Sequence, residues 1–321
     1  MRRRSWAVAV CMSVLVGCGG GSASDDGGGR DGGGVSAGNG GPDELFAETA
    51  SFEVVAGTPQ RLMVGLSTKD QRVLAGGTVT FTLKPAVESD AAPEPVIAKA
   101  TFLSVPAMPA VDGDARIGRP STGVGVYSTT VTLPESGIWT IEVKPNGPLS
   151  KRTAQTAVEV LSEPQVPAVG QLAPLTKNLT LTTPGVEQKW LDSGASPEFP
   201  ADPLLHSTVI ADAIAAERPL VIVVSTPAFC VSRFCGPVTE LVRTRAEKMA
   251  TDPKAPAFVH LEVWREFENT VVNKGAADWI LANGAEGREP WIFVVGRDGR
   301  ITARFDNVID EAALDAAIAA L

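Results

Sequence analysis

The sequence predicts two folded parts of different class, a β-sandwich followed by a mixed α/β domain, behind an N-terminal segment that does not fold. Three observations lead to this prediction. Residues 45–162 contain short alternating runs of β-branched residues between Gly and Pro turns, which is typical of an all-β domain. Residues 205–321 alternate helical and extended apolar patterns, which is typical of α/β proteins. Residues 163–204 lie between them and form a Pro-rich hinge and lead-in.

The first 17 residues have the parts of an export signal. Arg2–Arg4 are basic, and the apolar run Trp6–Val16 is too short to span a bilayer. The sequence Leu15-Val16-Gly17-Cys18 resembles the bacterial lipobox, in which a peptidase cuts before the cysteine and lipid is attached to its sulfur. This resemblance implies a palmitate-bearing lipoprotein anchored through Cys18 at the extracytoplasmic face of the cell membrane. The alternative is an ordinary signal peptide with a chance cysteine.

Residues 18–44 are predicted to be the lipidated cysteine and a flexible tether. Twelve of the 23 residues from Gly19 to Gly41 are glycine, and the others are mostly small or polar, so the segment lacks the apolar residues that folding needs. The whole chain carries a net charge of −9, which argues against binding to nucleic acid or to anionic headgroups. We therefore expect membrane contact through the lipid alone.

The predicted β-sandwich, residues 45–162, is built from short runs in which apolar and polar residues alternate. The runs are Phe52–Val55, Gln60–Leu66, Thr78–Leu83, Val126–Leu133, Ile138–Val143 and Thr156–Val160. Turn clusters such as Pro134–Gly137 separate them. Strands at this spacing resemble an immunoglobulin-like sandwich. The segment contains neither histidine nor cysteine, so we expect a spacer or a binding module rather than a catalytic domain.

The α/β part, residues 205–321, is predicted from alternating helical and extended periods. Helices are expected at Leu205–Ala216, Val238–Ala250, Ala276–Ala282 and Glu311–Leu321. Strands are expected at Pro219–Val224, Ala257–Trp264, Trp291–Val295 and Ile301–Phe305, with a turn at Arg297–Gly299. Alternating elements of this kind predict a central sheet with helices on both faces.

Residues at the ends of two of these strands resemble a known family. The apolar run Leu220–Val224 leads into a loop that ends Phe229-Cys230, and Glu289-Pro290 opens the strand that begins at Trp291. Together with the Asp-Gly hairpin that follows, they resemble an exported, membrane-tethered thioredoxin-like domain over residues 219–321. The resemblance implies a redox-active cysteine pair and a cis Glu289–Pro290 bond facing it. It also implies that backbone groups of the residue before Pro290 pair with a bound peptide.

Only two of the four cysteines are expected to remain as a candidate redox pair. Of the four cysteines, Cys11 would leave with the signal peptide and Cys18 would carry lipid, so Cys230 and Cys235 remain in a compartment where disulfides persist. The family's pair is Cys-x-x-Cys, whereas four residues separate these two. On one helix, residues five apart have Cα atoms about 8 to 9 Å from each other, which exceeds the reach of a disulfide, roughly 4.4 to 6.8 Å. Cys230 is therefore expected in the loop before the helix.

Two alignments to the family stay open. In one, Phe229-Cys230 corresponds to the family's aromatic residue and first cysteine. In the other, the run Phe234–Val238 resembles aromatic-Cys-Gly-Pro-Cys, which would make Cys235 the nucleophile and Cys230 the resolving cysteine. Pro237 favours a helix that begins near Cys235. The dipole of such a helix, aided by Arg233, would favour the thiolate of Cys235.

The resemblance leaves one catalytic task without its usual residue. The family's buried carboxylate, six residues before the first cysteine, is replaced by Val224. His260, on the strand predicted beside the cysteine-bearing strand, could act as the general base instead. We favour the alternative, a structural histidine satisfied by hydrogen bonds. Glu262 is the weaker candidate for the same task.

The favoured hypothesis for function is thiol–disulfide oxidoreduction on exported proteins, whose thiols or disulfides are the expected partners. The candidate catalytic residues are Cys230, Cys235, Pro290 and His260. A noncatalytic binding or scaffold lipoprotein with a structural disulfide is the main alternative. A copper-handling protein is a further alternative, but the cysteine spacing differs from that of such proteins and the chain has only two histidines, His206 and His260. We expect no cofactor and no bound metal.

Overall fold

The computed structural model describes residues 43–87, 92–106, 108–230 and 234–321. The predicted export signal, Cys18, the tether up to residue 42 and Arg233 lie outside the described residues, so these predictions stay untested. The described residues belong to one compact unit. Within the described part of the chain, no helix combines the length and the apolar character needed to cross a membrane.

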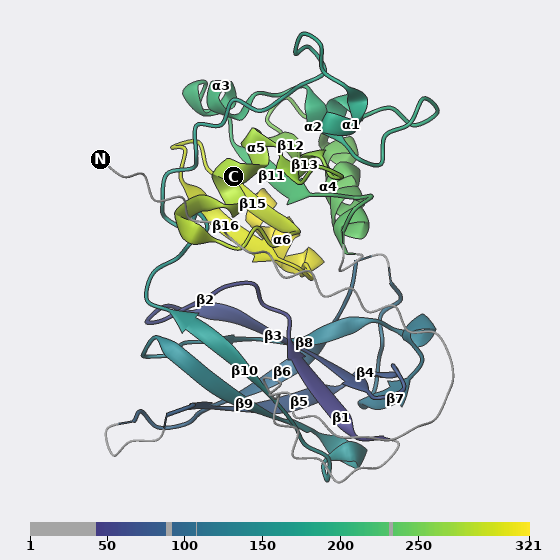
Figure 1. Ribbon diagram of the computed structural model, residues 1–321, viewed down its shortest axis with the longest axis vertical. Coiled ribbons are helices and arrows are strands. Elements are labelled where there is room, and N and C mark those ends of the chain that lie inside the picture. The colour runs from purple at the N-terminus through teal and green to yellow at the C-terminus, as the bar shows by residue number, and fades with distance from the viewer. Residues whose placement is uncertain (1–42, 88–91, 107, 231–233) are drawn as a thin grey trace, which may run out of the picture. The chain divides into compact units, whose positions relative to one another are not determined.

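The first ten strands form one hydrogen-bonded sheet (Figure 1). They are β1 (Leu45–Thr49), β2 (Val54–Val55), β3 (Gln60–Thr68), β4 (Val73–Ala75), β5 (Thr78–Pro85), β6 (Val96–Ser104), β7 (Arg116–Gly118), β8 (Gly125–Val131), β9 (Gly137–Pro145) and β10 (Ala154–Leu161). Their order is β2-β10-β9-β5-β6-β8-β3-β4-β7, and β1 pairs with β3. The short 3-10 helices η1 (Pro120–Thr122) and η2 (Gly147–Leu149) lie in its loops. This part of the protein is β-rich, as the sequence predicts.

The core of this sheet follows the alternation of side chains along each strand. On β9, Trp139, Ile141 and Val143 are buried while the residues between them are exposed. Tyr127 on β8 is fully buried, and its hydroxyl donates to the carbonyl of Gly76 at 2.8 Å. The polar end of this aromatic side chain is thus satisfied inside the core.

The described strands do not form the two separate sheets expected of a sandwich. Strand β6, which the sequence analysis missed, pairs with β5 on one side and with β8 on the other, and so joins both halves into one sheet. Ala98 and Ala100 weaken the strand signal of this segment because alanine is depleted in strands. The immunoglobulin-like prediction therefore holds in its coarser sense, an all-β domain.

A second sheet has four strands and lies within residues 205–321 (Figure 1). Its strands and following helices are β11 (Leu220–Ser225), α4 (Cys235–Met249), β12 (Ala257–Glu262), α5 (Lys274–Ile280), β15 (Trp291–Val295), β16 (Ile301–Asp306) and α6 (Glu311–Ala319). The order is β12-β11-β15-β16; β11 and β12 are parallel, and the other two pairs are antiparallel. A separate hairpin, β13 (Trp264–Glu266) with β14 (Val271–Val272), follows β12, and η3 (Ala282–Gly284) follows α5.

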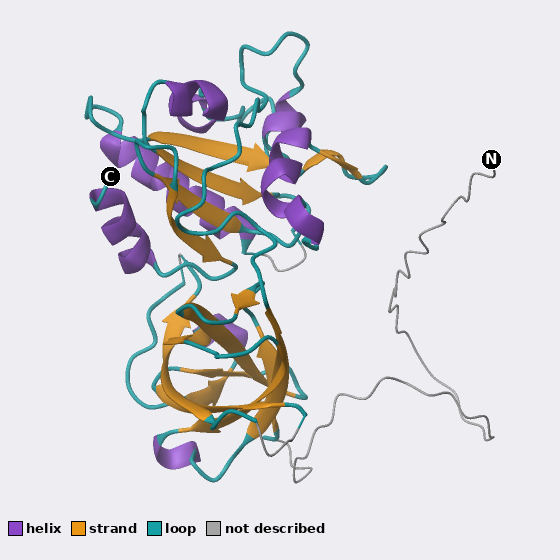
Figure 2. Ribbon diagram, turned by 90° about the vertical axis from the view of Figure 1, so that its left-hand side faces the viewer, coloured by secondary structure: helices purple, strands orange, loops and turns teal. Residues whose placement is uncertain are grey.

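Helices cover both faces of the four-stranded sheet (Figure 2). Every residue of β11 is buried, because its side chains face helices alternately on the two sides. Ile222 packs in a cluster with Trp279 of α5, whereas Val223 packs in a cluster with Val242 of α4 and Leu314 of α6. The prediction of helices on both faces is confirmed.

One predicted helix, Leu205–Ala216, is wrong, because the chain breaks it in the middle. Two shorter helices replace it: α2 (Pro203–His206) and α3 (Ile210–Ala215). The cause is Asn178, whose side-chain amide donates to the carbonyl of Thr208 at 3.0 Å and whose oxygen accepts from the amide of Ile210 at 2.9 Å. These bonds take the place of helical ones, so the backbone at Val209 is extended.

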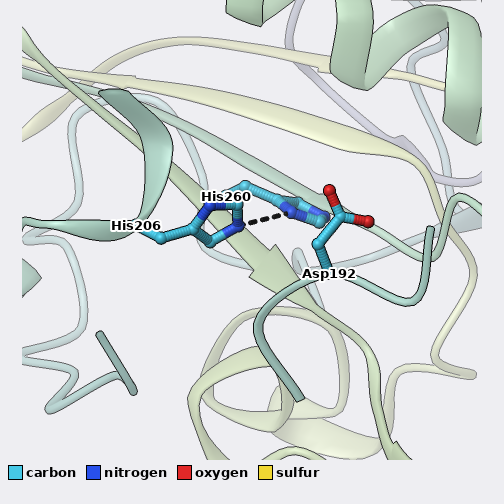
Figure 3. A group of neighbouring side chains, drawn as sticks. All are labelled: Asp192, His206 and His260. Carbon is cyan, nitrogen blue, oxygen red and sulfur yellow. Dashed lines mark hydrogen bonds between the residues drawn. The ribbon is translucent and has the colours of Figure 1, made fainter. Parts of the chain in front are cut away.

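The break decides where His206 lies. It is the last residue of α2, it is buried, and its Nε2 lies 3.0 Å from Nδ1 of His260 on β12. Asp192, just after α1 (Gln188–Leu191), lies beside the two rings (Figure 3).

The predicted hinge, residues 163–204, packs along the four-stranded sheet. Leu172 forms a β-bridge with Arg300, and the amide of Ala173 donates to the carbonyl of Gly299 at 2.9 Å. Thr176 and Asn178 in the same segment are buried. The segment therefore contributes to the core rather than merely connecting two folded parts.

An ion pair links the N-terminal sheet to β16 inside the compact unit. Nη2 of Arg304 lies 2.7 Å from Oε1 of Glu53, and their side chains are only 11% and 4% exposed. The second carboxylate oxygen of Glu53 accepts the amides of Gln165 and Val166. Hydrogen bonds of this kind compensate a buried carboxylate for the water it loses.

Candidate functional site

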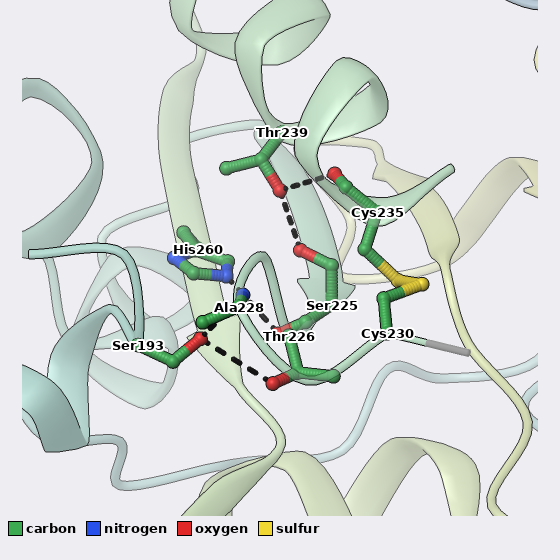
Figure 4. The surroundings of a disulfide bond; sticks show 8 residues. All are labelled: Ser193, Ser225, Thr226, Ala228, Cys230, Cys235, Thr239 and His260. Atoms are coloured by element: carbon green, nitrogen blue, oxygen red, sulfur yellow. Dashed lines mark hydrogen bonds between the residues drawn. A yellow bond between two sulfur atoms is a disulfide. The ribbon is translucent and has the colours of Figure 1, made fainter. Parts of the chain in front are cut away.

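The cysteine pair lies between the end of β11 and the start of α4. Cys230 and Cys235 form a disulfide with Cα atoms 6.0 Å apart (Figure 4). Cys235 is the first residue of α4. The helix therefore begins three residues earlier than the pattern of apolar residues predicts, at the position that Pro237 indicates. Cys230 lies outside the helix, so the prediction from helix geometry is confirmed.

The two sulfur-bearing residues differ in exposure. Cys235 is fully buried, whereas Cys230 is half-buried. A substrate sulfur can approach only the more exposed partner. Because Cys235 begins α4, the dipole of this 15-residue helix stabilises negative charge on its sulfur.

Hydroxyl groups fix the start of α4 against β11. Oγ1 of Thr239 donates to the carbonyl of Cys235 at 2.8 Å and lies 2.7 Å from Oγ of Ser225, the last residue of β11 (Figure 4). All three residues are buried. The helical cysteine is therefore held in place by a satisfied polar network rather than by the disulfide alone.

The bond between Glu289 and Pro290 is cis, so that prediction is confirmed. Pro290 directly precedes β15, the neighbour of β11. An oxygen of Glu289 and the sulfur atoms of Cys230 and Cys235 all lie within 4.8 Å of one another. The structure thus brings the proline segment and the cysteine pair together.

Glu289 is a site residue that the sequence analysis did not select. Burial raises the pKa of its carboxyl group to about 7, and the negative charge of Glu262 adds to the rise. The group therefore changes protonation near neutral pH beside two sulfur atoms. Its position directly before Pro290 is the signal that could have identified it.

His260 and Glu262, the two residues considered as replacement bases, both have other partners. His260 is buried, with Nδ1 3.0 Å from Nε2 of His206 and Nε2 3.2 Å from the carbonyl of Ser225. Glu262 is also buried, and its two oxygens accept the amides of Ser193 and Trp264. These contacts favour the structural interpretation of His260.

Aromatic side chains lie next to Cys230 along the chain and across the β13–β14 hairpin. Phe229 stacks on Phe267 with ring centroids 4.2 Å apart, and Phe267 meets Trp264 edge to face at 5.5 Å. The guanidinium of Arg265 lies over the ring of Trp190 at 4.4 Å. These residues line a cavity of about 240 Å³.

Comparison with known proteins identifies no family for this chain. No protein-family model and no curated protein matches it. A β-glucosidase structure from Listeria innocua is 16% identical, with a TM-score of 0.20, over 37% of this chain and 16% of its own. The bacterial hydrophobin BslA is 13% identical, with a TM-score of 0.22, over 39% of this chain and 97% of its own. The chain therefore spans a small share of the β-glucosidase, and likenesses this weak carry no conclusion about fold or function.

Proposed function

We propose that the chain catalyses thiol–disulfide exchange on exported proteins through Cys230 and Cys235. The observation that carries this proposal is a disulfide whose cysteines differ in exposure and share a neighbouring carboxyl group, that of Glu289. A purely structural disulfide needs neither an accessible sulfur nor a titrating neighbour. An exchange catalyst uses both, because one sulfur meets the substrate and a proton moves when the second thiol attacks.

The order of elements supports a thioredoxin-like fold for residues 205–321. That family has a strand, a helix, a strand, a helix, a hairpin and a final helix, and β11, α4, β12, α5, β15, β16 and α6 follow the same order. The cysteines stand between the first strand and its helix, and Pro290 opens the hairpin. Both positions agree with those that the resemblance implies.

Membrane tethering through lipid on Cys18 is part of the same proposal. Its support is the basic cluster Arg2–Arg4, the short apolar run after it and the Gly17-Cys18 pair. A lipid anchor would keep the cysteine pair at the extracytoplasmic face of the membrane. Cys18→Ser is expected to release the protein from the membrane fraction; retention of the variant there would contradict this part.

The first step uses the more exposed cysteine. In the reduced protein, the thiolate of Cys230 attacks one sulfur of a substrate disulfide. A bond forms between Cys230 and that sulfur, the substrate disulfide breaks, and the second substrate sulfur leaves as a thiolate that takes a proton from water. The product is a mixed disulfide between Cys230 and the substrate.

The second step uses the buried cysteine and Glu289. The thiol of Cys235 gives its proton to the carboxylate of Glu289 and attacks the sulfur of Cys230. The mixed disulfide breaks, and the departing substrate sulfur takes the proton back from Glu289. Two electrons have then passed from the cysteine pair to the substrate, and the reverse sequence oxidises a substrate dithiol. A carboxyl group with a pKa of about 7 can both accept and return this proton near neutral pH.

Trapping the mixed disulfide tests the proposal and the assignment of the two cysteines. Cys235→Ser is expected to accumulate a covalent adduct with a peptide disulfide, because the attacking thiol remains and the resolving thiol is gone. Cys230→Ser is expected to form no adduct. The reduction potential of the wild-type pair should fall between about −120 and −270 mV. A potential below about −300 mV together with no adduct would leave a structural disulfide in a binding or scaffold lipoprotein.

Soft-metal binding by the reduced pair is a second candidate function. One observation favours it, namely that the ligand atoms of Cys230, Cys235 and Glu289 lie within 4.8 Å of one another. Two thiolates suit Cu(I). Anaerobic titration of the reduced protein with Cu(I), compared with Cys230→Ser, tests this candidate: tight binding lost in the variant would support it.

A further inference from the structure

Three side chains from separate segments meet beside β12. His206 ends α2, His260 lies on β12 and Asp192 follows α1 (Figure 3). Ligand atoms of all three lie within 4.8 Å of one another. The chain contains two histidines in 321 residues, and both are in this group.

The outer nitrogens of the two rings face backbone carbonyls. Nδ1 of His206 lies 2.8 Å from the carbonyl of Asp202, and Nε2 of His260 lies 3.2 Å from the carbonyl of Ser225. A carbonyl oxygen only accepts hydrogen bonds, so the tautomer with a proton on each outer nitrogen satisfies both contacts. In neutral rings the facing nitrogens, Nε2 of His206 and Nδ1 of His260, then both present lone pairs.

These two nitrogens are 3.0 Å apart, and their lone pairs repel each other unless a cation lies between or beside them. An added proton is one such cation, but burial works against it. The His206 and His260 side chains are 1% and 2% exposed.

We propose that Asp192, His206 and His260 form a binding site for a divalent transition metal ion of the Zn²⁺ type. Two imidazole nitrogens and a carboxylate are ligands that such ions take in proteins. Nitrogens 3.0 Å apart, each about 2.05 Å from a metal, subtend an angle of about 94° at it. Water completes the coordination from the half-buried side of Asp192.

The groups around the ligands are those of a metal site. Each ring donates its outer N–H to a backbone carbonyl, which fixes the ring orientation and makes the facing nitrogen more basic. Oδ1 of Asp192 accepts the amide of Gly194 at 2.8 Å, which orients the carboxylate. Metal binding joins α1, α2 and β12, and the site contains no sulfur, so the inference does not depend on the proposed exchange activity.

Calorimetric titration of the full chain with Zn²⁺ tests the site. The Cys230–Cys235 bond is kept oxidised and the remaining thiols are alkylated, so that sulfur does not compete. We expect one Zn²⁺ per chain, and Asp192→Asn should weaken binding at least tenfold without unfolding the protein, because this side chain is half-buried. Asp298→Asn is the matched control: it removes the same charge from an exposed hairpin and should leave the affinity unchanged.

X-ray absorption at the zinc edge provides a second measurement that does not depend on a variant. We expect two imidazole ligands, oxygen ligands and no sulfur. Absence of stoichiometric Zn²⁺ binding, wild-type affinity in Asp192→Asn, or a spectrum with fewer than two imidazoles would overturn the proposal. The facing nitrogens would then share a proton instead.

Discussion

The hydroxyl oxygens of Ser225 and Thr239 lie 2.7 Å apart in the interior, where the last residue of β11 meets the first turns of α4. The same Thr239 oxygen donates to the carbonyl of Cys235, and the carbonyl of Ser225 accepts from His260 (Figure 4). Ser225 therefore connects the two ends of this network: its carbonyl bonds to the histidine pair, and its hydroxyl bonds through Thr239 to the buried cysteine. None of these residues touches a sulfur through these bonds.

Thr239→Val should destabilise the oxidised protein by about 1 to 2 kcal/mol, because it leaves the buried hydroxyl of Ser225 without this partner. Urea unfolding measures the change. Thr244→Val is a matched control on the same helix, since its hydroxyl also bonds to the carbonyl four residues before it but is exposed. If the two variants lose equal stability, the buried hydrogen bond between Thr239 and Ser225 adds no stability beyond that of an exposed one.

Glu289→Gln should change stability in a pH-dependent way. The folded state raises the pKa of this carboxyl group from 4.5 to about 7, so its favourable contribution is present below pH 4.5 and is lost as the pH rises through 7. The neutral amide avoids that loss. We expect the variant to gain about 3 kcal/mol relative to wild type at pH 8 and little at pH 4, by urea unfolding with the disulfide intact.

The control for this measurement is Glu286→Gln, an exposed carboxylate three residues earlier. It should show no such difference between the two pH values. An equal gain at pH 4 and pH 8 in Glu289→Gln would mean that the carboxyl group is not perturbed in the folded state.

The same residue should control the rate of the second chemical step. In wild type, release of substrate from the mixed disulfide should accelerate with pH through an inflection near 7, as Glu289 becomes able to accept a proton. Glu289→Gln should lose that inflection and slow the step about 100-fold at pH 7. Single-turnover kinetics measures it, and an unchanged profile would remove Glu289 from the mechanism.

Arg304→Met should cost about 3 kcal/mol of stability, because it leaves the carboxylate of Glu53 buried without its cation. The double variant with Glu53→Gln should recover part of that loss, since no charge is then buried. Arg300→Met removes an exposed arginine directly before β16 and should cost less than 1 kcal/mol of stability. Denaturant unfolding distinguishes these values, and additive losses in the double variant would mean that the pair is not coupled.

Local patterns were sufficient to predict where the cysteines lie and which strands surround them. Cys230 and Cys235 are linked by a short segment, and the strand before them is a continuous apolar run, so helix geometry alone placed Cys230 in a loop. The histidine pair could not be found in this way. Asn178, about thirty residues upstream, breaks the expected helix after His206, and no periodicity within that helix reveals such a distant partner.

Glu289 illustrates a second limit of the sequence. A charged residue before a proline is ordinarily a solvated loop residue. Its raised pKa arises from burial and from the nearby Glu262, which approaches it only once the sheet has formed. The resemblance to thioredoxin-like proteins directed attention to the proline, whereas the proposed proton transfer uses the residue before it.

Phe267→Ala should distinguish peptide substrates from small ones. This residue is 41% exposed and stacks on Phe229, the neighbour of Cys230, so it can contact apolar side chains beside a substrate disulfide. Aromatic contacts contribute about 0.5 to 1.5 kcal/mol, which is about 2- to 10-fold in kcat/KM. We expect a loss of that size with a peptide disulfide flanked by aromatic residues, and less than about twofold with glutathione disulfide, which lacks them.

Phe199→Ala, which truncates a phenylalanine that is 73% exposed and does not line this cavity, should affect neither substrate. Equal losses with both substrates would show that Phe267 supports the cysteine loop and does not select the substrate.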